Sequence, residues 1–200
     1  MKKDIIISGV GGQGILTIAA LLDTAALLED LFVKQSEIHG MSQRGGAVQS
    51  HVRIADREVY SDLIPYGQAD MLLSIEPMEL FRYLPYMAPD AVVLTDINPY
   101  VNIPDYPDKD ELMAAIKQFP RHVIVDARDI AKKTGNIRAQ NIVLLGAASH
   151  FLPFKDETME EAIRQLFQRK GDRIVNMNID AYYRGKEAVK DQIDKWLAKQ

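Results

Sequence analysis

A run of glycines near the start of the chain constrains the fold more than any other feature. Gly9-Val10-Gly11-Gly12-Gln13-Gly14 lies between the short β-branched run Asp4–Ser8 and an Ala- and Leu-rich segment from Ile15 to about Glu29. The order predicts a buried strand, a glycine turn and a helix. Such a turn presents backbone N–H groups and a positive helix end to an anion. The glycines are equally consistent with a turn that only packs tightly, because this spacing alone is a weak signal.

Composition favours a folded α/β protein and narrows its partners. The 200 residues are 47% hydrophobic, so a sizeable core can form, and we expect a single domain over residues 1–200. The net charge is −4 and basic residues form no run, which argues against nucleic acid or an anionic membrane surface as a partner. The N-terminus lacks a signal-peptide pattern, and no apolar run is long enough to span a bilayer. We therefore expect a cytoplasmic protein.

The chain contains no cysteine. Disulfides, thiolate nucleophiles, zinc–thiolate sites and cysteine-ligated iron–sulfur clusters are therefore excluded within it. Its four histidines, His39, His51, His122 and His150, lack a metal-binding spacing. The chain also has no G-x-S-x-G elbow and no G-x-x-x-x-G-K-[ST] phosphate loop.

A second glycine-containing loop follows the next predicted strand. Leu31–Glu37 reads as that strand, and Glu37 lies 23 residues beyond Gly14, where a dinucleotide-binding fold carries its ribose-binding acid. The loop Ile38–Gly46 leads into Ala47–Ile54, whose alternating pattern predicts a strand with one polar face. Asp56-Arg57 is typical of a turn and Glu58–Ser61 of a short return strand. This antiparallel hairpin makes the predicted sheet mixed.

The remainder of the chain alternates strands with helices and ends in a helical third. Predicted strands are Ala69–Ile75, Ala91–Asp96 and His122–Asp126; predicted helices are Glu76–Leu84, Asp110–Phe119, Ala127–Lys133, Ala139–Leu152, Glu157–Arg169 and Ala181–Ala198. The first helix is apolar nearly all round, so we expect the C-terminal helices to cover it, with a partner subunit as the alternative. Gly146 and its neighbouring alanines indicate a close helix crossing. The predicted fold is three-layer, Rossmann-like α/β with a mixed central sheet.

Arg44 is the most informative side chain of the second loop. It stands between Gln43 and Gly45-Gly46, where it can clamp a phosphate or carboxylate, or instead pair with Glu37 in a purely structural loop. We expect both glycine loops at the C-terminal ends of adjacent strands, where open α/β sheets bind ligands.

Three ordered motifs resemble the gamma-type domain of the 2-oxoacid:ferredoxin oxidoreductases. They are the glycine turn, the stretch Glu37-x-His39-Gly40-Met41-Ser42-Gln43-Arg44-Gly45-Gly46-x-Val48, and Asn136–Ala148 with Asn141-Ile142-Val143-Leu144-Leu145-Gly146. The resemblance extends over about residues 3–190. The second loop is similar to the indolepyruvate branch, specifically its small beta subunit. The pyruvate and 2-oxoglutarate branches tend to have a Tyr-Gly-x-Glu-x-Arg-Gly-Gly loop instead.

The resemblance implies an accessory role in oxidative decarboxylation of aryl 2-oxoacids to aryl-acetyl-CoA, with ferredoxin reduction. Thiamine diphosphate and the iron–sulfur clusters would belong to a larger alpha subunit in a hetero-oligomer, with coenzyme A as co-substrate and ferredoxin meeting the complex. It assigns this chain no catalytic residue and no metal ligand. The cofactor-binding positions that it marks are Gly9, Gly11, Gly12, Gln13, Gly14, Glu37, His39, Met41, Gln43, Arg44, Gly45 and Gly46. Two alternatives stay open: a stand-alone nicotinamide dehydrogenase and a non-enzymatic scaffold subunit.

Overall fold

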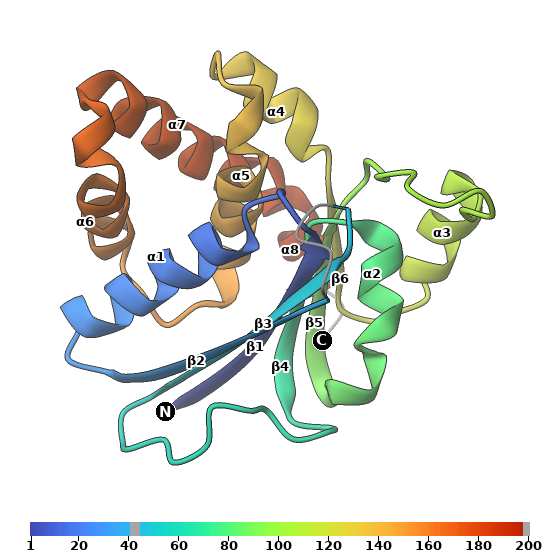
Figure 1. The fold of residues 1–200 in the computed structure, drawn as a ribbon, viewed down its shortest axis with the longest axis horizontal. Helices are drawn as coiled ribbons and strands as arrows, with labels where there is room; N and C mark the ends of the chain where they lie inside the picture. The colour runs from blue at the N-terminus through green and yellow to red at the C-terminus, as the bar shows by residue number, and fades with distance from the viewer. Residues whose placement is uncertain (41–44, 198–200) are drawn as a thin grey trace.

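The computed structural model describes residues 1–40 and 45–197, which form a three-layer α/β fold around a mixed sheet (Figure 1). Six strands of the described chain lie in the order β2-β3-β1-β4-β5-β6. Their bounds are Lys2–Val10 (β1), Phe32–His39 (β2), Ala47–Ala55 (β3), Ala69–Ser74 (β4), Met87–Asp96 (β5) and His122–Val125 (β6). β1 pairs parallel to β4 and antiparallel to β3, and β3 pairs antiparallel to β2. The mixed sheet and the fold class predicted from the sequence are confirmed.

The central strand β1 contributes to both apolar faces of the sheet. Ile5 and Ile7 belong to one hydrophobic cluster and Ile6 to the other, and all three side chains are fully buried. A strand covered on both faces reads as a continuous apolar run, which is why Ile5-Ile6-Ile7 marks the centre of the sheet.

One face is covered by α1 and by the C-terminal helices. The helices are Ile15–Leu28 (α1), Ala127–Lys133 (α4), Gln140–Ala148 (α5), Asp156–Phe167 (α6), Asp172–Ala188 (α7) and Lys190–Leu197 (α8). α1 packs on β2 and β3, and on its other sides meets α5 and α6. The Glu29 carboxylate, just beyond α1, accepts hydrogen bonds from Lys155 N and Thr158 Oγ1 at the start of α6. The expectation that the chain's own C-terminal helices cover the first helix is confirmed.

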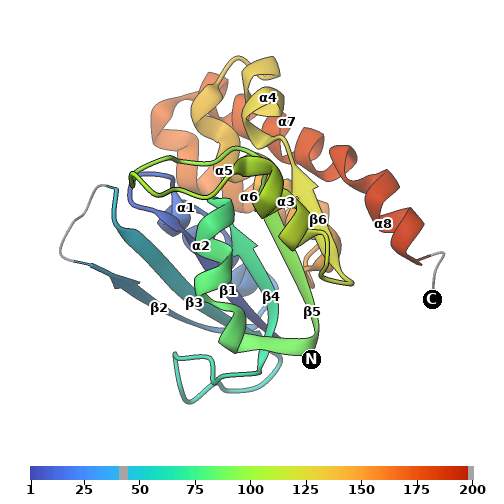
Figure 2. The same ribbon diagram turned by 90° about the vertical axis from the view of Figure 1, so that its right-hand side faces the viewer.

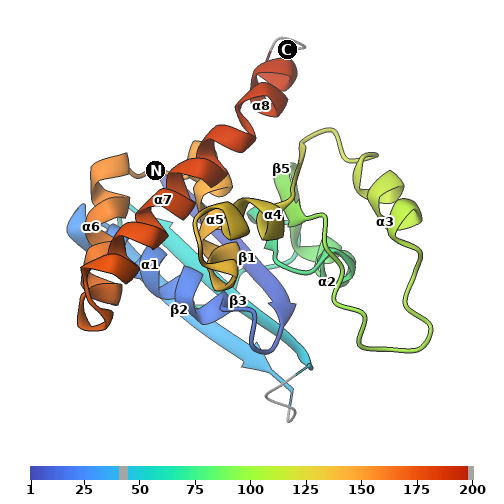
Figure 3. The ribbon, with the colours of Figure 1, turned by 90° about the horizontal axis from the view of Figure 1, so that it is seen from above.

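The predicted close crossing at Gly146 is also confirmed, and its partner is a second glycine. Figure 3 shows α7 crossing α5. A Cβ atom at Gly146 would lie 1.9 Å from the Tyr182 carbonyl oxygen, and one at Gly185 would lie 1.9 Å from the Val143 carbonyl oxygen. The two backbones therefore touch directly, because neither crossing residue carries a side chain.

The other face is covered over β4 and β5 by α2 (Pro77–Arg82) and α3 (Lys109–Ile116), while β2 and β3 lie beside α2 (Figure 2). Pro77 begins α2, and the Glu76 carboxylate caps it by accepting a hydrogen bond from Glu79 N. At the β6 edge, the Gln192 amide of α8 bonds both the N–H and the C=O of Ile124. That side chain pairs the exposed backbone N–H and C=O of Ile124, which a neighbouring strand would otherwise pair.

Two predicted elements are wrong. Residues 58–61 form no strand, because β1 and β2 already occupy both sides of β3. The segment is held instead by side chains: Lys34 Nζ donates to the Tyr60 carbonyl and Arg53 to the carbonyls of Ser61 and Leu63. The prediction of a single last helix from Ala181 is also wrong, since α7 begins at Asp172 and α8 follows from Lys190. Among the described helices, none combines the length and apolar character needed to cross a membrane.

Candidate binding site at the glycine turn

The turn between β1 and α1 is held closed by its own glutamine. Gln13 N donates to the Val10 carbonyl at 3.1 Å, and Gln13 Oε1 accepts from Val10 N at 2.7 Å. Gly9 leaves room for this side chain, since a Cβ at Gly9 would lie 2.7 Å from Gln13 Oε1. The side-chain amide oxygen of Gln13 therefore stabilises the turn through this hydrogen bond.

Gly14 ends the turn in the left-handed region and is the N-cap residue before α1. Its φ is 85°, and a Cβ there would lie 2.5 Å from Asn141 Nδ2, which donates to the Gly14 carbonyl at 3.2 Å. Both the backbone angle and the contact with α5 therefore require glycine. No side chain of the described residues caps this helix end. Its first backbone N–H groups remain available to an anion.

The two glycine loops are joined by main-chain hydrogen bonds. Gly11 N donates to the Gly46 carbonyl at 2.9 Å, and Gly45 N lies 3.5 Å from the Gly11 carbonyl. Asn102, in the long loop after β5, donates to the Gly45 carbonyl at 2.9 Å. The loops meet as expected, but the prediction that they follow adjacent strands is wrong. β3 lies between β1 and β2, and the second loop leads into β3.

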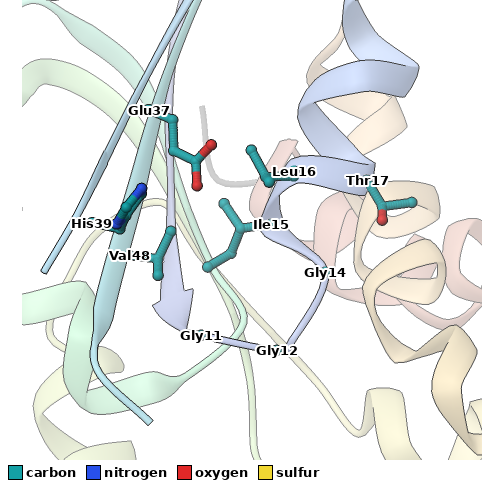
Figure 4. A pocket seen from close by; sticks show the side chains of 9 residues that line it. All are labelled: Gly11, Gly12, Gly14, Ile15, Leu16, Thr17, Glu37, His39 and Val48. Atoms are coloured by element: carbon teal, nitrogen blue, oxygen red, sulfur yellow. The ribbon is translucent and has the colours of Figure 1, made fainter. Parts of the chain in front are cut away.

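A cleft of about 490 Å³ opens between the start of α1 and the end of β2. Figure 4 shows Glu37 and His39 on one side of it and Ile15 and Leu16 on the other. The lining residues are Gly11, Gly12, Gly14, Ile15, Leu16, Thr17, Glu37, His39 and Val48. The cleft is mainly apolar, with one carboxylate and one imidazole at its strand side.

Two further clefts adjoin the same turn and carry positive charge. One, of about 340 Å³, is lined by Gly12, Gln13, Gly14, Thr17, Asn136, Arg138, Asn141, Phe167, Lys170, Ile174 and Asn178. The other, of about 430 Å³, is lined by Gly12, Gln13, Ile75, Asn98, Pro99, Tyr100, Arg128, Ile137, Arg138 and Gln140. Arg138 lies between the two. None of Arg128, Arg138 and Lys170 forms an ion pair with the described residues. These three cations beside the glycine turn are therefore available to bind a phosphate or carboxylate.

The position of these clefts follows from the order of the strands. After β1 the chain crosses through α1 on one face to the β2 edge, whereas β4, β5 and β6 follow in the other direction with α2 on the opposite face. The parallel neighbours β1 and β4 therefore form a topological switch point. Open α/β sheets bind ligands in the crevice at the carboxyl ends of such strands, and here those ends carry the glycine turn and Ile75.

The long loop after β5 is anchored on a buried acid beside this crevice. Glu76 Oε1 accepts from Tyr100 N at 3.2 Å and from the Tyr106 hydroxyl. Burial and that hydrogen bond raise the pKa of Tyr106, which keeps its hydroxyl a donor. At the end of β5, burial raises the pKa of Asp96 to about 6, although hydrogen bonds from Asn98 oppose the shift. The loop that carries Asn98 and Tyr100 into the cleft is thereby fixed at several points.

Most of the marked positions gather at this site. Gly11, Gly12, Gly14, Glu37 and His39 line the first cleft, and Gln13 lines the other two. Gly9, Gly45 and Gly46 shape the turn from behind or beside it. Met41, Gln43 and Arg44 lie outside the described residues, so their binding roles, and the pairing of Arg44 with Glu37, stay predictions.

Sequence reasoning missed the cations of the site. Arg128 is on α4, Arg138 is on the 3-10 turn Ile137–Ala139 before α5, and Lys170 follows α6. Only the Asn136–Ala148 motif hinted at this region, and it singled out no side chain. In residues 1–40 and 45–197, no three His, Asp or Glu side chains group closely enough to hold a metal ion.

Comparison with known proteins agrees with this fold. A family model described as pyruvate ferredoxin/flavodoxin oxidoreductase matches residues 4–188. The chain belongs to this family, as the sequence motifs predicted.

Within the family, the chain is 38% identical to indolepyruvate oxidoreductase subunit IorB of Archaeoglobus fulgidus, over 92% of this chain and 94% of the relative. The crystal structure of a keto/oxoacid ferredoxin oxidoreductase gamma subunit from Geobacter sulfurreducens matches with a TM-score of 0.69 and 26% identity, over 93% of this chain and 97% of that one. The 2-oxoglutarate:ferredoxin oxidoreductase of Magnetococcus marinus, solved with coenzyme A bound, has the same fold. Its TM-score is 0.75 at 20% identity, and the match covers 95% of this chain and 31% of that chain.

Proposed function

We propose that this chain is the small subunit of an indolepyruvate:ferredoxin oxidoreductase. The complex converts an aryl 2-oxoacid and coenzyme A to aryl-acetyl-CoA and carbon dioxide, and passes the two electrons released to ferredoxin. The observation that carries the proposal is the near full-length similarity to subunit IorB at 38% identity. The glycine turn at the switch point of the sheet supports it, because this is where a ligand-binding cleft is expected.

In this proposal the prosthetic groups belong to a larger alpha subunit. Thiamine diphosphate supplies the carbanion stabilisation that decarboxylation needs, and iron–sulfur clusters accept the electrons. The residues of this chain do not fit a cluster, because it has no cysteine to ligate one. In this proposal the small subunit therefore acts on the co-substrate and on the assembly, and carries no cysteine-ligated cluster.

The cationic clefts are suited to the phosphate groups of coenzyme A. Arg138 faces both clefts, with Lys170 in one and Arg128 in the other. The uncapped N-terminus of α1 adds backbone N–H donors beside them. Together these groups can bind a pyrophosphate and orient the pantetheine thiol toward the larger subunit.

The dehydrogenase alternative is not supported by the geometry of Glu37. In a dinucleotide-binding fold the ribose-binding acid ends the strand next to β1. Here Glu37 is on β2, and β3 separates it from β1, which places the acid two strand spacings away, about 9–10 Å. Glu37 therefore lines the first cleft from a strand that is one position farther from β1 than the strand of a ribose-binding acid.

Substitution of Arg138 tests the coenzyme A role. In the assembled enzyme, Arg138→Ala should raise KM for coenzyme A about tenfold, the loss of one charge-assisted hydrogen bond of about 1.5 kcal/mol. KM for the 2-oxoacid should stay constant. Lys133→Ala is the matched control, since Lys133 is an exposed cation paired with Asp129 outside the clefts. An equal effect of the two variants would reject the role of Arg138.

Assays of separated subunits test the division of labour. With thiamine diphosphate, coenzyme A and ferredoxin supplied, this chain alone should reduce no ferredoxin. Mixing it with the larger subunit should give arylpyruvate-dependent and coenzyme A-dependent reduction. Activity of either subunit alone, equal to that of the mixture, would contradict the proposal. The scaffold alternative predicts instead that Arg138→Ala leaves every kinetic constant unchanged.

A further inference from the structure

One of the two cationic clefts contains a set of asparagine side chains whose role the proposed function does not yet assign. It measures about 340 Å³, and Asn136, Asn141 and Asn178 line it together with Arg138 and Lys170. We name it the asparagine cleft. Asn141 is on α5 and Asn178 is on α7, the two helices that cross in Figure 3. A site for phosphate alone needs only cations and N–H donors, so the asparagines require a separate explanation.

Two of these amides are oriented by main-chain carbonyl groups. Asn141 Nδ2 donates to the Gly14 carbonyl at 3.2 Å, and Asn178 Nδ2 donates to the Ile174 carbonyl at 2.8 Å. A carbonyl oxygen can only accept a hydrogen bond, so the NH₂ group of each amide must face it. The Oδ1 atoms of Asn141 and Asn178 are therefore the halves of the two amides that remain for a ligand.

Both oxygens can be reached from the asparagine cleft. No donor among the described residues bonds Asn141 Oδ1 or Asn178 Oδ1. The side-chain atoms of the described chain that are both buried and unpaired are Asp23 Oδ1, Gln49 Oε1 and His51 Nε2. The two asparagine oxygens are unpaired and do not belong to that group, so they are accessible, and both side chains line the cleft.

The rest of the lining adds a donor, apolar surface and positive charge. Asn136 is oriented the opposite way, because its Oδ1 accepts from Arg138 N at 3.1 Å and its NH₂ group is left to donate. Phe167 and Ile174 supply apolar surface. Lys170 Nζ lies 5.3 Å from the centre of the Phe167 ring, which keeps this cation at the cleft. Acceptors, a donor, an apolar wall and two cations therefore meet in one cleft.

This combination suits a nucleoside phosphate better than a phosphate alone. Phosphate oxygens are acceptors, so they cannot satisfy the amide oxygens of Asn141 and Asn178. A ligand that does so must donate N–H or O–H hydrogens close to its phosphate. Adenosine has an amino group and ribose hydroxyls that donate, ring nitrogens that accept and a flat base that packs on apolar side chains.

We propose that the asparagine cleft binds the adenosine 3′-phosphate end of the thiol co-substrate. Asn141 and Asn178 accept hydrogens from the adenine amino group and the ribose, and the two cations bind the phosphates. The identity of the thiol rests on the proposed function. Arg138 also lines the adjoining cleft of about 430 Å³, so the remainder of the molecule can extend through that cleft. The chain would thereby select a thiol that carries adenosine and reject 4′-phosphopantetheine held on a carrier protein.

Calorimetric titration of the purified full chain tests the proposal, because every residue that it names belongs to this chain. The wild type should bind adenosine 3′,5′-bisphosphate with a sub-millimolar Kd, about tenfold tighter than 4′-phosphopantetheine. Purine riboside 3′,5′-bisphosphate, which lacks only the amino group, should bind about tenfold more weakly than the adenosine compound.

Asn178→Leu removes the amide at nearly constant side-chain size and should weaken binding of adenosine 3′,5′-bisphosphate about tenfold. Gln118→Met is the matched control. The Gln118 amide also donates to a carbonyl four residues earlier, that of Ala114, but it lines neither cationic cleft. This variant should bind like the wild type.

Thermal unfolding verifies that each variant is folded, and the amino-free ligand decides with the wild type alone if Asn178→Leu is destabilised. Absent binding of adenosine 3′,5′-bisphosphate, equal binding of the amino-free ligand, or equal effects of Asn178→Leu and Gln118→Met would each overturn the proposal. Tighter binding of 4′-phosphopantetheine would assign the cleft to the pantoyl end and also overturn it. All of these results leave the proposed function intact, since that is tested by ferredoxin reduction in the assembled enzyme. Adenosine 3′,5′-bisphosphate binding without coenzyme A-dependent ferredoxin reduction would instead reject the proposed function and support the nucleotide site.

Discussion

Replacing Gly146 by alanine tests the crossing that holds the C-terminal third over the sheet. The new Cβ would lie 1.9 Å from the Tyr182 carbonyl oxygen, whereas ordinary contact begins at 3.4 Å, so α5 and α7 must separate locally by about 1.5 Å. Overpacking costs about 1–3 kcal/mol, and the close atom is backbone, which cannot rotate away. Alanine returns up to about 1 kcal/mol of helix propensity.

With overpacking at the upper end of that range, about 3 kcal/mol, less about 1 kcal/mol of helix propensity, the expected net loss in the free energy of unfolding is about 2 kcal/mol. For a chain of this size it corresponds to a fall in Tm of about 4–8 °C, measured by circular dichroism. Gly40→Ala is the matched control, because no atom of the described residues lies within 4 Å of the position that its Cβ would take; its Tm should be unchanged. Because Asn141 on α5 and Asn178 on α7 line the same cleft, KM for coenzyme A should also rise. A Gly146→Ala variant as stable as the control would refute the packing argument.

Three further predictions concern the turn, a buried acid and the rejected cofactor. Gly14→Ala should lose at least about 1 kcal/mol more stability to urea than Gly12→Ala: both have positive φ, but only the Gly14 Cβ meets Asn141, and equal losses would contradict this. The folded-state pKa of Asp96 is about 6, above its ordinary value of 3.8, so its ionisation should cost stability as pH rises from about 4 to 6. Asp96→Asn should therefore match the wild type at pH 4 and exceed it by about 1–3 kcal/mol at pH 7.5; a pH-independent difference would disprove the burial effect. Calorimetric titration of the isolated chain with NAD(H) or NADP(H) should show no micromolar binding, because of the position of Glu37.

The core elements could be predicted because their signals are local. Ile5-Ile6-Ile7 is β-branched and ends at a glycine, and Ala127–Lys133 is bounded by Asp126 and Gly135. In both cases the residues that determine the element lie within it or next to it. The observed bounds of α4 therefore equal the predicted ones.

The errors occur where distant partners decide the conformation. Glu58–Ser61 carries a strand-like pattern, but β3, with which it was predicted to form a hairpin, already has two neighbours. At α7, Gly171 precedes the helix with a φ of 87°, and the helical segment from Asp172 is defined by its contact with α5. In Asp172–Asp180 the apolar pattern is interrupted by Asn178, which lies on the buried side of the helix.

The cations of the site are unpredictable for the same reason. Arg128, Arg138 and Lys170 are separated from the glycine turn by more than a hundred residues, and of the three only Arg138 lies in a recognised motif, Asn136–Ala148. They meet the turn because α4, the 3-10 turn Ile137–Ala139 and the residues after α6 line the same clefts as Gly12 and Gln13. The spacing of these residues in the sequence does not predict that packing.

The insertion of β3 between β1 and β2 distinguishes this sheet from a dinucleotide-binding one. In a dinucleotide-binding sheet the strand after the first helix returns beside β1 and brings its acid to the ribose. In this chain the returning strand is displaced by one position, and β3 takes the place beside β1. That exchange moves Glu37 away from the turn and brings Gly45 and Gly46 within hydrogen-bond reach of Gly11. Glu37 then faces the start of α1 only across the first cleft, while Arg138 and Lys170 lie in the adjoining cleft beside Gly12 and Gly14. A cleft of this kind suits a phosphate-bearing co-substrate that enters from a neighbouring subunit better than a nicotinamide dinucleotide held by one chain.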